Sequence, residues 1–157
     1  MADLRWWIQA TPIGAITVSV GDAGVRSIQP GVVPVADGLE EIDREVASEL
    51  QEYFAGTRRL FSVPVDLSSV AGPVARIILD TLAATVPFGS TVGYGELAQR
   101  AGRPGAARAV GQAMAHNPVP LIVPCHRVVA ASGALGGFGW GAEIKRWLLR
   151  HEGIQLL

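Results

Sequence analysis

The chain contains one cysteine, Cys125, and this limits how its fold can be stabilised. A single thiol forms neither an intrachain disulfide nor a multi-thiolate metal site, so a buried apolar core has to hold the fold together. Hydrophobic residues make up 49% of the 157 residues and charged residues 17%, a composition typical of folded globular proteins. We therefore expect one domain, or two small ones, without cross-links.

The sequence shows no sign of insertion into a membrane or of export. Its apolar stretches are far shorter than the roughly 20 residues that span a bilayer. The N-terminal segment MADLRWW lacks the basic leader and apolar core of a secretory signal. Because a lone cysteine also suits a reducing compartment, we expect a cytoplasmic protein that does not contact membranes.

The net charge of −1 conceals an uneven distribution. Residues 1–72 contain five basic and ten acidic side chains, whereas residues 73–157 contain eight basic and four acidic ones. A basic second half favours contact of that half alone with a polyanion. The alternative is that the acidic side chains form the solvated face of one helix, since most of them lie within residues 40–52.

The first part of the chain is expected to form a small sheet and one helix. Apolar residues from Leu39 to Phe54 recur with helical spacing, which predicts an amphipathic helix that ends near Gly56. Residues 61–65 are expected to add a short strand. Three further strands, separated by turn signals, are expected at residues 6–9, 15–20 and 25–29.

The second part of the chain is predicted to be helical. Ala71-Gly72-Pro73 indicates a boundary, because proline suits the first position of a helix. Two short helices on either side of a glycine-containing break at 102–105 form a helix-turn-helix pattern, which is weak evidence because many helical proteins contain such corners. The spacing of apolar residues predicts helices over residues 73–86, 94–101, 106–115 and 144–151.

One face of the expected helix 106–115 combines a long cation with small residues. At 100° per residue this face presents Arg108, Gly111, Gln112 and Ala115. Small residues would let the helix backbone approach a partner closely while Arg108 projects outward. The alternative is an exposed arginine without a partner.

The cysteine is followed directly by two side chains that can favour its anionic form. His126 and Arg127 come next in the segment VPCHRVV. Because the thiolate and not the thiol is the nucleophile, a basic setting for a lone cysteine indicates covalent chemistry. The alternative is a buried cysteine that only fills space.

Two further features near the C-terminus concern a possible ligand-binding loop and a buried carboxylate. Residues 131–141 contain five glycines and few charges, which is typical of a mobile loop that can lie against a flat ligand. Glu152 follows Leu148 by four positions and so lies at the edge of the last helix's apolar face, where an inward carboxylate usually has a partner. The alternative is that Glu152 frays into water.

Taken together, these residues resemble the O6-alkylguanine-DNA alkyltransferase family, also called methylated-DNA–protein-cysteine methyltransferases. The segment PCHRV at residues 124–128 is highly specific to that family. The resemblance spans nearly the whole chain. The other matching blocks, in the family's order, are residues 52–56, 86–89, Tyr94, 106–111, 117–120, Lys145, 147–149 and 151–153.

The resemblance implies an α+β fold with two domains. Residues 1–70 would form a structural domain with a ribonuclease-H-like sheet and helix. Residues 71–157 would form a helical domain with a winged-helix-like helix-turn-helix, which binds DNA and accepts the alkyl group. Family members insert the second helix of this motif into the minor groove, unlike most such motifs.

The activity implied by the resemblance is DNA repair by direct reversal. The thiolate of Cys125 would take the alkyl group from O6-alkylguanine, or from O4-alkylthymine, in duplex DNA. By resemblance, His126 takes the thiol proton through a water and Glu152 orients the imidazole, a relay similar to a hydrolase triad. Tyr94 matches the residue proposed to protonate the departing guanine, and Asn117 one that ties the helix-turn-helix to the active-site segment. The thioether product is not reversed, so one molecule repairs one lesion, without a cofactor.

The resemblance also implies how DNA is bound. Arg108 would enter the base stack in place of the flipped-out nucleotide, because O6 of guanine is buried inside the duplex. The partner is duplex DNA that carries the lesion, bound in the cytoplasm, or at the nucleoid in a bacterium. The sequence gives no reliable oligomer signal; we expect a monomer in solution and leave clustering on DNA open. The implied DNA contacts are Ala107, Arg108, Gly111, Gln112, Ala115 and Tyr94. The implied substrate pocket is formed by Val128, Gly136, Phe138, Gly139 and Trp140.

Two departures from the family's pattern limit what carries over. Trp140 stands where some relatives have glycine, and its bulk would narrow the pocket against large alkyl groups. Some relatives hold zinc through N-terminal cysteines, and we expect no metal here because the only cysteine is Cys125.

Three other functions remain open. A lesion sensor would flip the base without repairing it, but such relatives lack the nucleophilic cysteine. A sequence-specific transcription factor would need more base-reading side chains than Arg108 and Gln112. A cysteine hydrolase would turn over repeatedly, whereas a repair protein would react once and stop.

Overall fold

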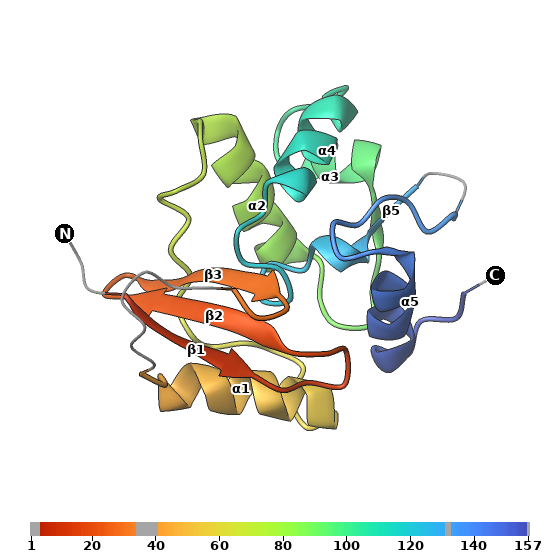
Figure 1. The fold of residues 1–157 in the computed structure, drawn as a ribbon. Coiled ribbons are helices and arrows are strands. Elements are labelled where there is room, and N and C mark those ends of the chain that lie inside the picture. The colour runs from red at the N-terminus through yellow and green to blue at the C-terminus, as the bar shows by residue number, and fades with distance from the viewer. Residues whose placement is uncertain (1–3, 34–40, 131–132, 157) are drawn as a thin grey trace. The chain divides into compact units, whose positions relative to one another are not determined.

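A computed structural model describes residues 4–33, 41–130 and 133–156. It divides into two compact units, an N-terminal unit (Met1–Ser69) and a C-terminal unit (Val70–Leu157). The N-terminal unit combines a sheet with one helix, and the C-terminal unit is mostly helical (Figure 1). The predicted mixed α+β architecture is confirmed. Within the described ranges, no helix is long and apolar enough to cross a membrane.

The N-terminal unit is built on an antiparallel sheet in the order β1-β2-β3. Trp7, Val18 and Ile28 are in register across the three strands, and all three side chains are buried. Because alternate side chains point to opposite faces, this row identifies the face that forms the core. The strands are β1 (Arg5–Gln9), β2 (Ile16–Gly21) and β3 (Gly24–Pro30).

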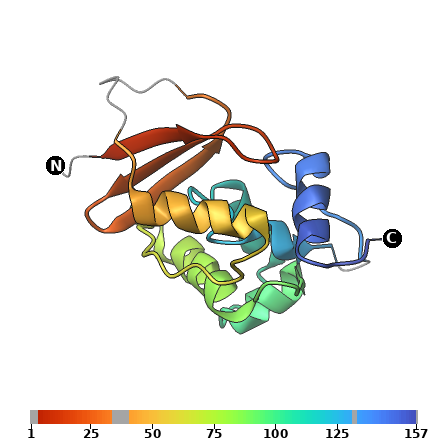
Figure 2. The same ribbon diagram turned by 90° about the horizontal axis from the view of Figure 1, so that it is seen from below.

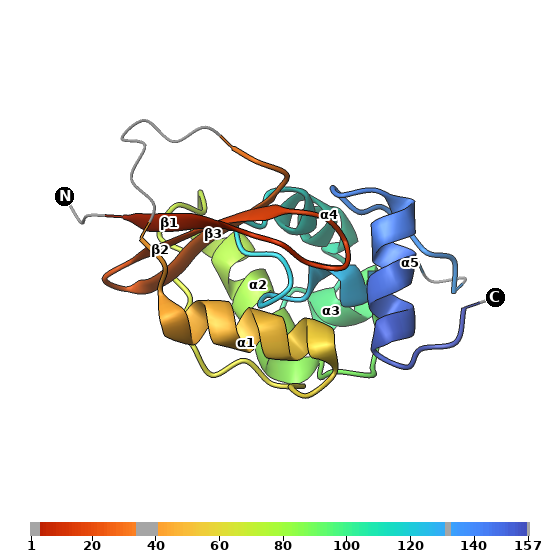
Figure 3. The same ribbon diagram turned by 60° about the horizontal axis from the view of Figure 1, so that its bottom comes forward.

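Helix α1 (Arg44–Ala55) runs along one face of this sheet, as Figures 2 and 3 show from two directions. The side chain of Gln9 donates a hydrogen bond to the carbonyl of Ala47 (3.0 Å) and so joins β1 to the helix. The helix ends at Gly56, whose φ of 81° lies in the left-handed region that glycine adopts without strain. Its buried face carries Val46, Glu49, Leu50, Tyr53 and Phe54.

Two expectations for the N-terminal unit are wrong in detail. The helix begins at Arg44 and not at Leu39, because the carboxylate of Asp43 accepts a hydrogen bond from the Val46 amide (3.2 Å) and caps the first turn. Residues 34–40 lie outside the described ranges. Residues 61–65 form no strand. Only Val65 pairs with β3, in a single parallel bridge to Val25, the residue after Gly24. The Val25 amide donates to the Pro64 carbonyl and the Asp66 amide donates to the Val25 carbonyl (2.9 Å each), and the pairing extends no further.

The C-terminal unit begins with α2 (Pro73–Thr85), which starts at a proline as predicted. Helices α3 (Tyr94–Arg100) and α4 (Ala107–Ala115) pack against α2 and against each other (Figure 1). The turn between them contains Gly102 and Gly105, both with left-handed φ angles. The predicted pair of helices with an intervening glycine turn is confirmed.

A short parallel strand pair positions the cysteine in this unit. Strand β4 (Val92–Gly93) directly precedes α3 and pairs with β5 (Val128–Val129). A 3-10 helix formed by Cys125–Arg127 leads into β5 and contacts the last helix, α5 (Ala142–His151). The strand pair therefore brings the cysteine segment next to the start of α3, where Tyr94 lies.

Candidate active site

The segment before Cys125 is fixed by one asparagine. The side chain of Asn117 accepts a hydrogen bond from the Val119 amide (3.0 Å) and donates one to the carbonyl of Val123 (2.9 Å). The Cys125 amide in turn donates to the same carbonyl (2.8 Å). Asn117 follows α4 closely, so these bonds join the end of this helix to the cysteine segment, the position that the family resemblance implies for this residue.

His126 and Glu152 meet inside the C-terminal unit, although 25 residues separate them in the chain. Nε2 of His126 lies 2.7 Å from Oε2 of Glu152, and both side chains are completely buried. Arg127 donates from Nε to Oε1 of the same carboxylate (2.8 Å) and from another guanidinium nitrogen to the Val86 carbonyl (2.8 Å). The expectation of an inward Glu152 with a partner is confirmed.

The ionisation of the buried Glu152 carboxylate determines the protonation and tautomer of the His126 imidazole. Burial alone would raise the pKa of Glu152, but hydrogen bonds from His126 and Arg127 outweigh it and lower the pKa to about 2. Burial also lowers the pKa of His126, against the opposing effect of Glu152, so the ring is neutral at neutral pH. An ionised carboxylate only accepts hydrogen bonds, so Nε2 must carry the ring proton.

The other ring nitrogen of His126 is therefore available as a base. Nδ1 holds the free lone pair of the neutral ring. It is buried and has no hydrogen-bond partner among the described residues. A buried acceptor without a partner is rare in native proteins and points to a role in chemistry.

Cys125 is 7% exposed, and its thiol is protonated in the free protein. Burial raises the pKa of this thiol to about 11, although the Asn117 side chain and the charge of Lys145 act in the opposite direction. The expectation that Arg127 favours the thiolate is wrong, because its guanidinium faces Glu152 and the Val86 carbonyl. The cation that acts on the sulfur is Lys145.

Lys145 belongs to the site although we had placed it only within a matching block of sequence. Its side chain is fully buried, and Nζ donates to the carbonyls of Val128 (2.6 Å) and Gly137 (3.1 Å). Burial lowers the pKa of Lys145 to about 8, against the opposing effect of the Cys125 charge. The lysine thus links β5 to the glycine-rich segment before α5.

Cys125 lies in the wall of a pocket of about 230 Å³. We call it the Cys125 pocket. Two of the predicted pocket residues, Phe138 and Gly139, line it, and so does Tyr94. The full lining is Tyr94, Gly111, Met114, Ala115, Cys125, Gly137, Phe138 and Gly139. An opening of this kind gives a flat ligand a route to the sulfur, which a thiol enclosed by packed side chains would not have.

Three residues predicted for the pocket do not line it. Val128 is buried in β5 and contributes its carbonyl to Lys145. Gly136, with φ of 75°, lies so close to Tyr94 Oη that an added Cβ would be 3.4 Å away. The Trp140 ring contacts Phe138 at a centroid distance of 6.1 Å. Trp140 therefore contacts a lining residue but is not itself part of the lining.

Five of the six predicted DNA-binding residues lie on α4, and the sixth, Tyr94, begins α3. Ala107, Arg108 and Gln112 are exposed. Gly111 and Ala115 of the same helix line the Cys125 pocket. The face with one long cation and small neighbours therefore borders the opening to the sulfur. Met114 of the same helix is only partly buried and lines the pocket as well.

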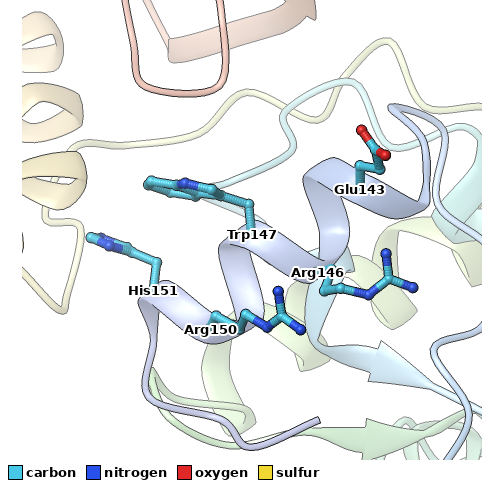
Figure 4. A pocket seen from close by; sticks show the side chains of 5 residues that line it. All are labelled: Glu143, Arg146, Trp147, Arg150 and His151. Carbon is cyan, nitrogen blue, oxygen red and sulfur yellow. The ribbon is translucent and has the colours of Figure 1, made fainter. Parts of the chain in front are cut away.

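A larger hollow of about 560 Å³ lies on α5 and does not include the cysteine. Trp147 and His151 stack there, with ring centroids 4.8 Å apart. Figure 4 shows these two rings extending to one side of the helix and Arg146 and Arg150 to another. Because Cys125 is not among its lining residues, this hollow is not the candidate site. Among the described residues, no group of three or more His, Cys, Asp or Glu side chains could hold a metal ion.

Two known proteins with similar sequences carry the same name. A family model described as "6-O-methylguanine DNA methyltransferase, DNA binding domain" matches residues 74–154. The methylated-DNA–protein-cysteine methyltransferase of Mycolicibacterium paratuberculosis is 39% identical over 148 residues, which are 90% of this chain and 88% of that protein. The protein of that name from Shigella flexneri is 46% identical over 71% of this chain, but the match spans only 64% of its own length.

Solved structures agree with the sequence matches. The crystal structure of Mycobacterium tuberculosis O6-methylguanine methyltransferase superposes with a TM-score of 0.83 at 35% identity, covering 96% of this chain and 93% of that one. The M. tuberculosis protein OGT crystallised in complex with DNA gives a TM-score of 0.82 at 37% identity, covering 95% and 91%. With the fold, the cysteine motif and the matched length in agreement, the chain belongs to the methylated-DNA–protein-cysteine methyltransferase family.

Proposed function

We propose that this protein repairs alkylated DNA by direct reversal. A bond forms between the Cys125 sulfur and the alkyl carbon while the bond from that carbon to O6 of guanine, or to O4 of thymine, breaks. The thiol proton leaves to a base, and the departing nucleobase takes up a proton, so the products are a thioether and an unmodified base. The observation that supports this most is that the Cys125 pocket opens onto a sulfur that directly precedes a neutral histidine paired with an ionised carboxylate.

A thiol with a pKa of about 11 needs a base before it can attack. His126 supplies it in our proposal, because Nδ1 has a free lone pair and a bridging water can carry the proton from the sulfur. Glu152 keeps the ring in the required tautomer and stabilises the imidazolium that forms, as the acid of a hydrolase triad does. Lys145 stabilises the developing thiolate by its charge.

Two further side chains have supporting roles in the proposed reaction. Tyr94 lines the Cys125 pocket and is proposed to give a proton to the departing guanine. Asn117 is a positioning residue that holds the cysteine segment through the amide of Val119 and the carbonyl of Val123. Neither role needs a cofactor.

The partner we propose is duplex DNA that carries the alkylated base. O6 of guanine is inaccessible inside the stack, so the nucleotide must rotate out, at a cost of about a few kcal/mol. We propose that α3 and α4 act as a helix-turn-helix, that α4 enters the minor groove, and that Arg108 fills the gap in the stack. The exposed Arg108 and the small residues beside the pocket support this arrangement.

We propose that the two parts of the chain divide these tasks. Residues 71–157, with a winged-helix-like arrangement, would carry DNA binding and alkyl transfer, and they include every group discussed above. Residues 1–70, with a ribonuclease-H-like sheet and helix, would be structural. We propose a monomer that acts in the cytoplasm.

The mass of the intact protein tests the proposed reaction. After incubation with a duplex that contains O6-methylguanine, we expect the protein to gain one methyl group, and the Cys125→Ala variant to gain none. Because the chain has a single cysteine, no other thiol can account for the gain. A protein whose mass stays unchanged while it binds the lesion tightly would instead be a sensor, and the proposal would be rejected.

Replacing Arg108 separates DNA binding from the chemistry. We expect Arg108→Ala to slow methyl transfer from duplex DNA about tenfold or more, because the flipped-out state loses the side chain that fills the stack. Transfer from a free O6-alkylguanine base needs no flipping, so its rate should change less than about twofold. Single-turnover rates on the two substrates give the comparison. Equal losses on both would exclude a role for Arg108 in base flipping.

A further inference from the structure

The guanidinium of Arg127 is held by three hydrogen bonds inside the C-terminal unit. Nε donates to Oε1 of Glu152 (2.8 Å), one terminal nitrogen donates to Oε2 of the same carboxylate (3.1 Å), and the other donates to the Val86 carbonyl (2.8 Å). The residue is only 6% exposed. A contact of this kind with both carboxylate oxygens requires the planar fork of an arginine, which a lysine does not have.

One oxygen of Glu152 connects this guanidinium to the imidazole. Oε2 lies 2.7 Å from Nε2 of His126 and also accepts the bond from Arg127. The carboxylate that orients the ring is therefore the one that pairs with the arginine. Because an arginine stays protonated in proteins, Arg127 and the ionised Glu152 together carry no net charge.

This charge balance matters for the proposed base. A buried carboxylate alone would favour the protonated imidazole, and such a ring could take no proton from the thiol. Burial is the largest cause that lowers the pKa of His126, and the charges of Arg127 and Lys145 add to it, whereas the hydrogen bond and the charge of Glu152 raise the pKa. The arginine thus opposes the effect of the carboxylate to which it is bonded.

The other titratable groups around His126 change their charge in different pH ranges. Arg127 and Cys125 are its neighbours in the 3-10 helix, and Lys145 and Glu152 come from α5 and its C-terminal end. The pKa is about 2 for Glu152, about 8 for Lys145 and about 11 for Cys125. Between about pH 5 and about pH 7, where an imidazole commonly titrates, these three groups keep their charge states.

We propose that Arg127 is a positioning residue for alkyl transfer that acts through Glu152: it holds the carboxylate in place and offsets its charge, so that His126 rests as the neutral base. The inference rests on the proposed function. Arg127 itself neither gives nor takes a proton. The thiol proton still passes to Nδ1 of His126, and the bonds formed and broken at the alkyl carbon are unchanged.

The first test is the titration of His126 in the free protein, followed by NMR of the imidazole nitrogens. The chain has only three histidines, so the His126 signals can be assigned with a His126→Gln variant. In Arg127→Met the charge is lost, and we expect the midpoint to rise by about one pH unit or more. Arg127→Gln should behave alike, and it keeps an N–H donor for the carboxylate where Arg127→Met does not fold. In Arg127→Lys the charge remains, so the midpoint should stay close to the natural one.

The second test is the pH dependence of single-turnover methyl transfer from a duplex with O6-methylguanine. In Arg127→Gln the loss of rate at low pH should begin about one pH unit higher than in the natural protein, because the ring is protonated earlier. Arg127→Lys should lower the rate without moving this loss. A purely structural role for Arg127 would lower the rate by the same factor at every pH.

Arg100→Met is the matched control. Arg100 also joins a glutamate, Glu96, to a carbonyl at the end of α2, that of Thr85, but this cluster is exposed, so neither pH profile should move. The inference is overturned if the folded neutral variants titrate at His126 like the natural protein, or if Arg127→Lys shifts the midpoint as far as they do. Neither result requires alkyl transfer. A natural protein that gains no methyl group would instead reject the proposed function.

Discussion

Glu152→Gln is expected to slow alkyl transfer by a factor on the order of 10² to 10⁴, because the corresponding change in a hydrolase triad leaves the histidine in the wrong tautomer. A glutamine at this position offers an amide N–H as well as an oxygen, and it no longer stabilises an imidazolium. Nδ1 of His126 then ceases to be the free base of the proposed reaction. Single-turnover transfer from a duplex with O6-methylguanine measures the loss.

The same substitution should lower the free energy of unfolding by about 3 kcal/mol, because the pKa of Glu152 lies about two units below its ordinary value and each unit corresponds to about 1.4 kcal/mol. A depressed carboxyl pKa contributes stability that is fully present above the unfolded value of about 4.3 and is lost as the pH falls towards 2. Urea unfolding at pH 7 tests the size of the effect. Most of it arises because the buried Arg127 loses the carboxylate that neutralises its charge.

Two further variants test whether the loss of stability in Glu152→Gln comes from the buried ion pair. Glu96→Gln removes the exposed partner of Arg100 on α3 and should cost less than about 1 kcal/mol. Combining Glu152→Gln with Arg127→Met removes both charges, so the pair should be less destabilising than the sum of the single changes. A Glu152→Gln protein that keeps the natural rate and stability would contradict the assigned relay.

The thiol of the free protein is expected to become about a hundredfold or more reactive towards iodoacetamide between pH 7 and pH 10, because only the thiolate reacts and its fraction grows about tenfold per pH unit below the pKa. With a pKa of about 11, the rate should reach no plateau in this range. The slope should decrease above about pH 8, where Lys145 loses the charge that lowers the thiol pKa. The rate of mass gain at each pH gives the profile.

Glutathione measured in parallel is the control, because an exposed thiol has a pKa of about 8.5 and its rate should level off near pH 9. If the protein's thiol levelled off below pH 8, the sulfur would already be a thiolate at rest. The proposed need for His126 as a base would then be wrong. A Lys145→Met variant should show the profile without the change of slope.

Local sequence signals predicted the elements well where neighbouring residues decide the structure. Pro73 marks the start of α2, and Gly56 ends α1, because each acts through its own backbone geometry. The start of α1 was misplaced because the spacing of apolar residues continues back to Leu39. The stronger signal was the capping carboxylate of Asp43, which decides the first turn.

The partners within the site could be predicted only in part. The pairing of His126 with Glu152 followed from a resemblance and from the position of Glu152 on a helical face. Lys145 could not be placed by pattern, because its partners are the backbone carbonyls of Val128 and Gly137, and any residue type provides a carbonyl. The raised thiol pKa was missed for a similar reason, since burial depends on tertiary packing and not on the two residues that follow Cys125.

The position of Cys125 also bears on how long an unused molecule survives. The methylating chemicals that damage DNA also attack thiols dissolved in the same water. A sulfur that is 7% exposed and protonated at rest is a poor target for them. Such a protein would outlast exposed cellular thiols during chemical stress and would remain intact until a damaged nucleotide enters the pocket.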